Sequence, residues 1–350
     1  MEQFAGKLLW FLFLAVVSGS LLVWSWVAWR LTEGTAVESL VPVERRRPVP
    51  WDGLAVAAIV FAWLALGVYL GKFAAEFAPV DPLVPKAARA APAAYERTVH
   101  GHGPNFCMAA VGLSASTVAE EVEDAKEGAA EQTTAHPLFQ LLMQGEWYHV
   151  VLGIFLAVLL APVFEEFVFR LVLQGWLEKK EGQWRRQERS LRALPRGVLA
   201  VAAVSLLFAG IHFRVADQML PLETVTRMIV LDSIPKVLTL VLAIILLRLG
   251  YGATAADLGW SWRHLGSDCR LGFFTFLAIA PALFALQAVL ALVFGEHFAA
   301  DPIPLFFLAL VLGGLYFRTH RIVPSIVLHA SLNGTSTLLV WLISIAGAGK

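Results

Sequence analysis

The sequence Ala161-Pro162-Val163-Phe164-Glu165-Glu166-Phe167-Val168-Phe169-Arg170 places two adjacent glutamates inside an apolar segment. The surrounding stretch, residues 150–177, is long enough to cross the roughly 30 Å of hydrocarbon in a bilayer. A single carboxylate at such a depth costs about 2.5–3.5 kcal/mol on insertion scales. Because ionisable residues inside membrane spans are usually functional, this pair indicates both a helical membrane protein and the position of its site.

The overall composition is that of a membrane protein. Hydrophobic residues make up 58% of the 350 residues and charged residues 15%, whereas soluble domains carry about 25% charged residues. The formal net charge is zero, which excludes a globally basic surface and with it a nucleic-acid partner. Apolar blocks of about 20 residues recur, and this is the length that crosses a bilayer. The lipid bilayer is therefore the first expected partner.

These blocks predict an all-α polytopic membrane protein with about eight transmembrane helices. The predicted spans are 8–31, 53–77, 150–177, 197–213, 228–249, 271–294, 303–317 and 322–346. The one long hydrophilic region contains several prolines and an acidic, alanine-rich run, which predicts a partly disordered or helical loop. We therefore divide the chain into two N-terminal transmembrane helices (1–77), this loop (78–147) and a six-helix core (148–350).

Basic residues set the predicted orientation. The densest cluster follows the third span and comprises Lys179, Lys180, Arg185, Arg186, Arg189, Arg192 and Arg196. Because lysine and arginine favour the cytoplasmic side, we expect this side in the cytoplasm and both chain ends outside. We further expect a bacterial-type inner or plasma membrane, with the site open toward the cytoplasm. The two cysteines, Cys107 and Cys269, fall in predicted loops on opposite sides, so no disulfide is expected.

Helical spacing distinguishes the two glutamates. Glu166 and Arg170 are four residues apart, so they share a helix face and can form an ion pair. Glu165 is rotated about 100° away and has no such partner, which makes it a candidate general base for a water molecule. A purely structural Glu–Arg pair between two helices explains Glu166 equally well, but it leaves Glu165 unexplained.

Two histidines and an amide fall in other predicted spans. His212 lies in the fourth span, and His329 and Asn333 lie in the last, four residues apart on one helix face. Each lies about 10–25 Å from the predicted cytoplasmic ends at about 1.5 Å per residue, so all of them can converge with the glutamates on one polar cavity. Taken singly, each histidine is better explained as a hydrogen-bonding residue between helices. Taken together, they favour a site.

Such a cluster suits hydrolysis by water. Glutamate and histidine can activate a water molecule, and histidine and asparagine can donate hydrogen bonds to a tetrahedral oxyanion. Because glutamate and histidine also ligate zinc, a water activated by Zn²⁺ or another divalent metal is an alternative, with Glu165, His212 and His329 as ligands. The sequence contains neither HExxH nor GxSxG.

Three motifs carry a resemblance to a known family. Glu165-Glu166-x-x-x-Arg170, Phe208-x-x-x-His212 and His329-x-x-x-Asn333 resemble, in this order, the motifs of the CPBP family. This family comprises type II CAAX prenyl endopeptidases and Abi-type, bacteriocin-processing membrane proteins. The resemblance covers about residues 150–346 and leaves out the first two spans and the long loop. It implies an intramembrane endopeptidase.

The resemblance also implies a role for each motif residue at the reaction centre. Glu165 would activate water together with His212, while His329 and Asn333 would form the oxyanion hole. The metal question stays open, because the family has been discussed both as metal-dependent metalloproteases and as metal-free glutamate proteases.

The remaining motif residues would support the site. Glu166 and Arg170 would orient it, and Phe208 would pack beside His212. The implied substrate is a membrane-associated protein or peptide, with prenylation and cleavage near a C-terminus left open. No feature of the sequence indicates the oligomeric state.

A membrane transporter or a scaffold without proteolytic activity is the alternative function. Buried glutamates and histidines also form proton relays. Asn333 argues against such a relay, because an amide beside His329 does not titrate.

Overall fold

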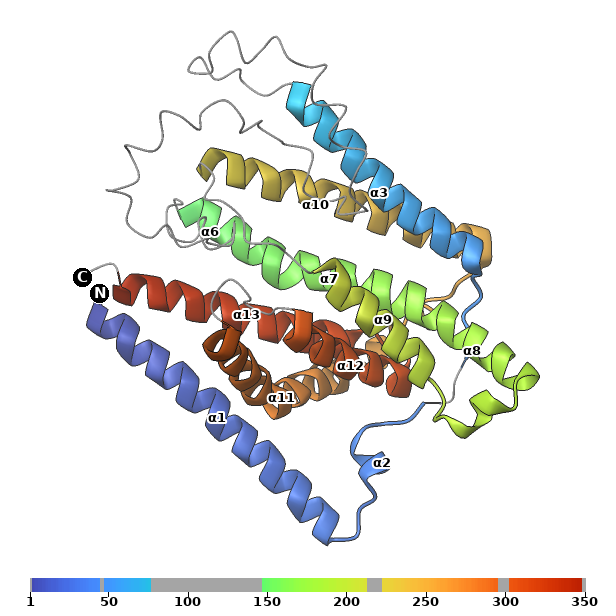
Figure 1. Cartoon of the computed structure of the whole chain (residues 1–350), viewed down its shortest axis with the longest axis horizontal. Helices are drawn as coiled ribbons and strands as arrows, with labels where there is room; N and C mark the ends of the chain where they lie inside the picture. The colour runs from blue at the N-terminus through green and yellow to red at the C-terminus, as the bar shows by residue number, and fades with distance from the viewer. Residues whose placement is uncertain (1, 45–46, 77–146, 213–221, 295–301, 348–350) are drawn as a thin grey trace.

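The structure, a computed structural model, describes residues 2–44, 47–76, 147–212, 222–294 and 302–347 (Figure 1). Within these ranges it is all-helical and contains no strand, as predicted. The described helices are α1 (Glu2–Thr32), α2 (Val37–Leu40), α3 (Gly53–Glu76), α6 (Trp147–Ile154), η3 (Phe155–Leu160), α7 (Ala161–Glu165), η4 (Glu166–Gln174), α8 (Gly175–Gln187), η5 (Ser190–Ala193), α9 (Val198–Ile211), α10 (Leu222–Ile245), η6 (Leu246–Gly250), η7 (Trp262–His264), α11 (Leu265–Phe294), α12 (Pro302–Thr319) and α13 (Val323–Gly347).

Seven helical segments of the described chain are long and apolar enough to cross a membrane. The fourth predicted span differs, because α9 has only 14 residues and is therefore about 21 Å long. Its apolar run is confined between Gly197, which has a left-handed backbone, and the polar His212. The span predicted for 197–213 is thus a short helix that ends inside the bundle. Figure 1 shows α1 beginning and α13 ending at the same end of the molecule.

The central helix runs without interruption from Trp147 to Gln187 and changes its winding along the way. Two stretches, η3 and η4, are π-helical, and such wider turns occur mostly at functional sites. Pro162 lies at the start of α7, where its missing N–H removes one donor of a regular α-helix. Glu165 ends α7 and Glu166 begins η4. The two glutamates therefore lie where the winding changes.

The central helix lies between two groups of neighbours (Figure 1). On one side α10 contacts α7 and also packs along α3, while on the other side α13 contacts η3 and α7. Helices α9 and α12 pack closely on each other, and both contact η4. Fully buried Phe164, Leu171 and Phe208 lie at these contacts. On the outer surface Leu249 and Leu292 are 83% and 86% exposed, as expected for side chains that face lipid.

Helix α13 is held against α11 at short distance. A Cβ on Gly272 would lie 2.4 Å from the carbonyl oxygen of Pro324 and 2.8 Å from Val327 Cβ, so only glycine permits this approach. The turn before α13 is fixed by Arg321, whose Nη1 lies 3.0 Å from Asp268 Oδ1. These contacts set the position of the helix that carries His329.

The N-terminal helices pack onto the rest of the bundle. Helix α1 contacts α11 and α13, and α3 contacts α10. The predicted hydrophilic loop, apart from Trp147, lies outside the described residues, as does Cys107. Cys269 lies within α11, and its prediction as a loop residue was wrong. The helix begins at Leu265, before the apolar run of residues 271–294, because polar residues continue a helix beyond the membrane-spanning part.

Candidate active site

The two glutamates point into the bundle from the junction of α7 and η4. The Glu166 side chain is fully buried, whereas the Glu165 side chain is 16% exposed. Because the exposed fraction of a side chain decides its access to water, Glu165 is the carboxylate that can meet a water molecule.

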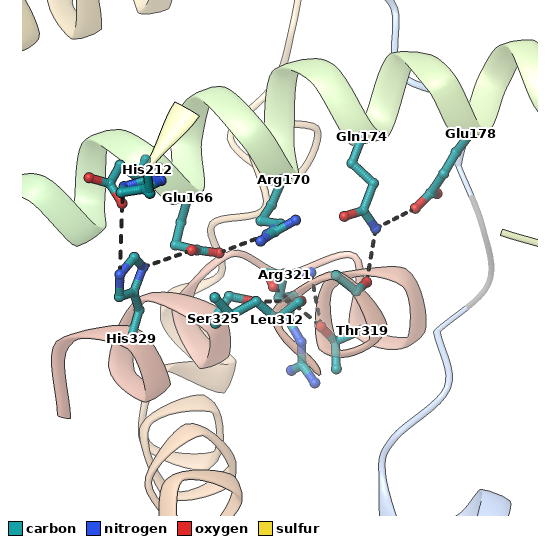
Figure 2. A network of polar contacts seen from close by, with 12 residues as sticks. Glu166, Arg170, Gln174, Glu178, His212, Leu312, Thr319, Arg321, Ser325 and His329 are labelled. Atoms are coloured by element: carbon teal, nitrogen blue, oxygen red, sulfur yellow. Dashed lines mark hydrogen bonds and ion pairs between the residues drawn. The ribbon is translucent and has the colours of Figure 1, made fainter. Parts of the chain in front are cut away.

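Glu166 is held from two sides (Figure 2). Its Oε2 lies 3.4 Å from Arg170 Nε, which is the ion pair predicted from the four-residue spacing. Its Oε1 lies 2.9 Å from His329 Nδ1 on α13. The Arg170 guanidinium is also fully buried and lies 5.3 Å from the centre of the Phe208 ring. Glu166 therefore joins the central helix to α13.

Glu165 faces two histidines from two other helices. Its Oε2 lies 3.7 Å from His212 Nε2 and 3.7 Å from His329 Nε2. These distances are longer than a direct hydrogen bond and leave the atoms close enough to share a small reactant. The structure thus brings together three residues that are separated by up to 164 positions in the sequence.

Helix α9 ends so that His212 is presented to the site. His212 is the residue after the last helical residue, and its Nδ1 lies 2.7 Å from the carbonyl oxygen of Phe208. This contact satisfies a carbonyl at the helix end, which apolar surroundings would otherwise leave unpaired. The Phe208 ring lies 4.4 Å from the His212 ring and 5.9 Å, edge-on, from the His329 ring. Phe208 therefore packs against both histidines.

Asn333 lies one turn beyond His329 on α13 and bonds to the central helix. Its Nδ2 donates to the carbonyl oxygen of Ala157 at 3.0 Å. An asparagine amide carries two N–H donors, so one remains for another acceptor. The structure brings Asn333 to the helix that carries Glu165, and the carbonyl of Ala157, in η3, is a partner that sequence spacing did not predict.

A family model matches residues 147–335, which is more than half of the chain and contains every residue of this site. The model is described as Type II CAAX prenyl endopeptidase Rce1-like. The chain belongs to this family. The family predicted from the three motifs is thereby confirmed. Searches of the curated proteins and of the solved structures returned no match. Membership of the Rce1-like family, a protease family, indicates endopeptidase activity.

The hydrogen-bond partners assign the protons of both histidines in this Rce1-like site. A carbonyl oxygen only accepts, so the His212 Nδ1 that contacts Phe208 carries a hydrogen. Glu166 is a carboxylate because it is paired with Arg170, so the His329 Nδ1 also donates. In both rings Nε2 therefore faces Glu165 and is the nitrogen that gains or loses a proton.

The predicted metal ligands are Glu165, His212 and His329. Among the described residues, no group of three or more His, Cys, Asp and Glu side chains is arranged so that it could hold a metal ion. Glu165, His212 and His329 come near such an arrangement, and the Nδ1 partners of the two histidines resemble the outer contacts of metal-bound histidines. The donor set is therefore chemically suitable but its spacing does not complete a metal site.

Sequence reasoning missed two polar groups near the site. On α10, which contacts α7, Lys236 forms an ion pair with Asp232. The sequence does carry a signal for this pair, because Asp232 and Lys236 are charged residues inside the otherwise apolar span predicted for 228–249. The other group is buried Gln174, whose Nε2 donates to Glu178 Oε1 and to the Gly313 carbonyl oxygen, both at 2.9 Å (Figure 2). It ties η4 to α12.

Proposed function

We propose that the chain is an intramembrane endopeptidase that hydrolyses a peptide bond of a membrane-associated protein or peptide. Glu165, together with His212, activates the attacking water molecule. The observation that carries this proposal is the convergence of His212 Nε2 and His329 Nε2 on Glu165 Oε2, each at 3.7 Å. It places a carboxylate with access to water between two nitrogens that can exchange protons.

In the first step Glu165 removes a proton from water. The water oxygen forms a bond to the carbonyl carbon of the substrate, and the electron pair of the C=O bond moves to its oxygen. In the second step the carbon–nitrogen bond breaks, and the leaving nitrogen takes a proton from Glu165 or from His212 Nε2. The products are a carboxylate and an amine. General base and acid catalysis of this kind contributes about 10²–10⁴-fold to the rate.

The oxyanion is stabilised from α13. His329 donates from Nε2 when this nitrogen carries a proton, and Glu166 holds the ring in place through Nδ1. Asn333 donates through the N–H that does not bond to Ala157. One oxyanion donor is worth about 10²–10³ in kcat in other hydrolases.

Charge balance supports this division of roles. Arg170 neutralises the charge of Glu166, so the Glu165 carboxylate carries the one remaining negative charge of the motif residues. One proton on either histidine makes the cluster neutral, which lowers the cost of holding it inside the membrane. The site can thus pass a proton between Glu165 and a histidine without creating a net charge.

The substrate side of the proposal rests on the family. A prenylated protein or a protein cut near its C-terminus is the proposed substrate, and the proposed cellular location is a bacterial-type inner or plasma membrane. The basic residues at the end of α8, among them Arg185 and Arg186, support an orientation with this end in the cytoplasm.

A comparison of membrane proteomes tests the proposal. Cells that contain wild-type protein, Glu165→Ala or Glu188→Ala are compared, Glu188 being an exposed carboxylate after α8. Uncut substrates should accumulate with Glu165→Ala and not with Glu188→Ala, at equal expression. Identical proteomes for all three, combined with proton uptake by liposomes that contain the wild-type protein, would favour the transporter alternative.

A further inference from the structure

A short segment before α3 lies against the helix that carries the site. Residues 49–52 fall outside the stretch that matches the family model. Trp51 is fully buried and Val49 is 8% exposed. Both approach Gly175, where a Cβ would lie 3.0 Å from Val49 Cγ1 and 3.7 Å from Trp51 Cζ2. The segment therefore packs directly onto the junction of η4 and α8.

Trp51 bonds to the part of η4 that follows Arg170. Its Nε1 donates to the carbonyl oxygen of Val172 at 3.1 Å. Val172 lies two residues after Arg170 and in the same π-helical stretch as Glu166. A π-helical stretch is rare and occurs mostly as a single turn inside an α-helix. An external donor at this carbonyl therefore helps to fix the winding of η4.

Lys179 fixes the segment on the same helix. Its ammonium group lies 3.0 Å from the Val49 carbonyl oxygen, 3.4 Å from that of Pro50 and 2.9 Å from that of Trp51. An ammonium has three donors, and here all three have a carbonyl of the segment within reach. Hydrogen bonds from a charged donor are stronger than those between neutral groups.

The other end of the segment is anchored to two further elements. Asp52 Oδ1 accepts hydrogen bonds from the backbone N–H groups of Leu54 and Ala55, at 3.0 and 3.1 Å, which caps α3. The Tyr251 hydroxyl donates to the same oxygen at 2.9 Å. The segment is thus fixed to α3, to the chain after η6, and to the central helix.

We propose that Trp51 is a positioning residue for Glu166 and Arg170, the ion pair that supports the site. Through Val172 it holds the turn of η4 that carries Glu166 and Arg170, and Glu166 in turn orients His329. The inference rests on the proposed function for its catalytic consequence. It makes the N-terminal part of the chain a component of the peptidase unit, so the segment that matches the family model does not by itself contain all the groups that set the site geometry.

The test compares Trp51→Phe with Trp176→Phe in the full chain. Trp176 lies on the central helix, one turn after Val172. Its buried Nε1 has no hydrogen-bond partner among the described residues. Both variants remove similar volume, but only Trp51→Phe removes a hydrogen bond. Val172 keeps the N–H of Gly175 as a donor, so Trp51→Phe should fold.

Two readouts are measured for each variant in liposomes. One is hydrolysis of an internally quenched, farnesylated peptide, analysed as separate kcat and KM values. The other is amide hydrogen exchange of the peptide that covers residues 166–174. Trp51→Phe should lower kcat about fivefold with an unchanged KM and accelerate amide exchange about fivefold. A change of this size corresponds to the loss of one hydrogen bond. Trp176→Phe should leave kcat and exchange within twofold of wild type.

The outcomes separate this inference from the proposed function. Equal behaviour of the two variants in both readouts overturns the positioning role, and so does faster exchange in Trp51→Phe with an unchanged kcat. If the wild-type protein does not cleave the peptide, the proposed substrate class fails. The exchange comparison then decides alone whether Trp51 holds η4.

Discussion

Removing Arg170 should destabilise the protein mainly because it leaves the buried Glu166 carboxylate without its ion-pair partner. Arg170 and Glu166 are both fully buried, and their Nε and Oε2 atoms lie 3.4 Å apart. Deleting one partner of a buried pair costs about 3–5 kcal/mol, because the other charge remains in a low-dielectric interior. We therefore expect Arg170→Met to lower the free energy of unfolding by about this amount.

The double variant Glu166→Gln/Arg170→Met should recover most of that loss. Glutamine is neutral, and its side-chain oxygen can still accept the hydrogen bond from His329 Nδ1, which now lies 2.9 Å from Glu166 Oε1. The residual cost should be about 1–2 kcal/mol, from the lost contact of the guanidinium with the Phe208 ring and imperfect packing.

The assay is denaturant unfolding in mixed micelles, read for both variants and for a surface control. Arg30 and Glu33 form an ion pair at the same 3.4 Å distance, but their side chains are 41% and 45% exposed. Arg30→Met should therefore cost less than about 1 kcal/mol. The reasoning is refuted if the double variant is no more stable than Arg170→Met, or if Arg30→Met costs as much as Arg170→Met.

Three further predictions concern the oxyanion donor, the helix contact and the segment before α3. Asn333→Ala should lower kcat about 10²-fold with little change in KM, which peptide cleavage measures; an unchanged kcat would remove this residue from the oxyanion hole. Gly272→Ala should destabilise the protein by about 1–3 kcal/mol, since its Cβ would lie 2.4 Å from the Pro324 carbonyl oxygen; a thermal midpoint equal to that of wild type would contradict the close packing. The pKa of Asp52 is lowered from 3.8, first by the hydrogen bond from the backbone of the third residue after it and then by that from the Tyr251 hydroxyl. The Asp52 carboxylate therefore stabilises the folded protein fully above 3.8, its pKa in the unfolded chain. This stabilisation is lost as the pH falls through the lower pKa that Asp52 has in the folded protein. Asp52→Asn should lack this loss of stability in acid, and identical acid unfolding curves would contradict the contact.

The sequence predicts the helical membrane fold well because spans depend on local composition. A block of about 20 apolar residues has few alternatives to a transmembrane helix. The error at α9 has the same origin. An apolar run of intermediate length cannot show whether the helix ends inside the bundle, because that ending depends on partners such as the hydrogen bond between His212 and the Phe208 carbonyl.

The candidate site is predictable in part. The Glu166–Arg170 pair follows from helical spacing, because both residues lie on one element. The contact between Glu166 and His329 joins residues 163 positions apart, and no local rule predicts it. The similar depth of the polar residues in their predicted spans, together with the ordered motifs of the family, suggested that the separate spans meet. The contact from Trp51 to Val172 has no sequence signal at all, since it joins residues 121 positions apart on separate elements.

The central claim is that Glu165 is the base that activates water. The most direct measurement is the initial rate of peptide cleavage by wild type and by Glu165→Gln in liposomes, at equal amounts of folded protein, on a substrate identified by the proteome comparison. The same measurement after extensive dialysis against a chelator reports whether a metal contributes. Glu165→Gln should cleave at least 100-fold more slowly, as the loss of a general base predicts. Cleavage at the wild-type rate by folded Glu165→Gln would contradict the account.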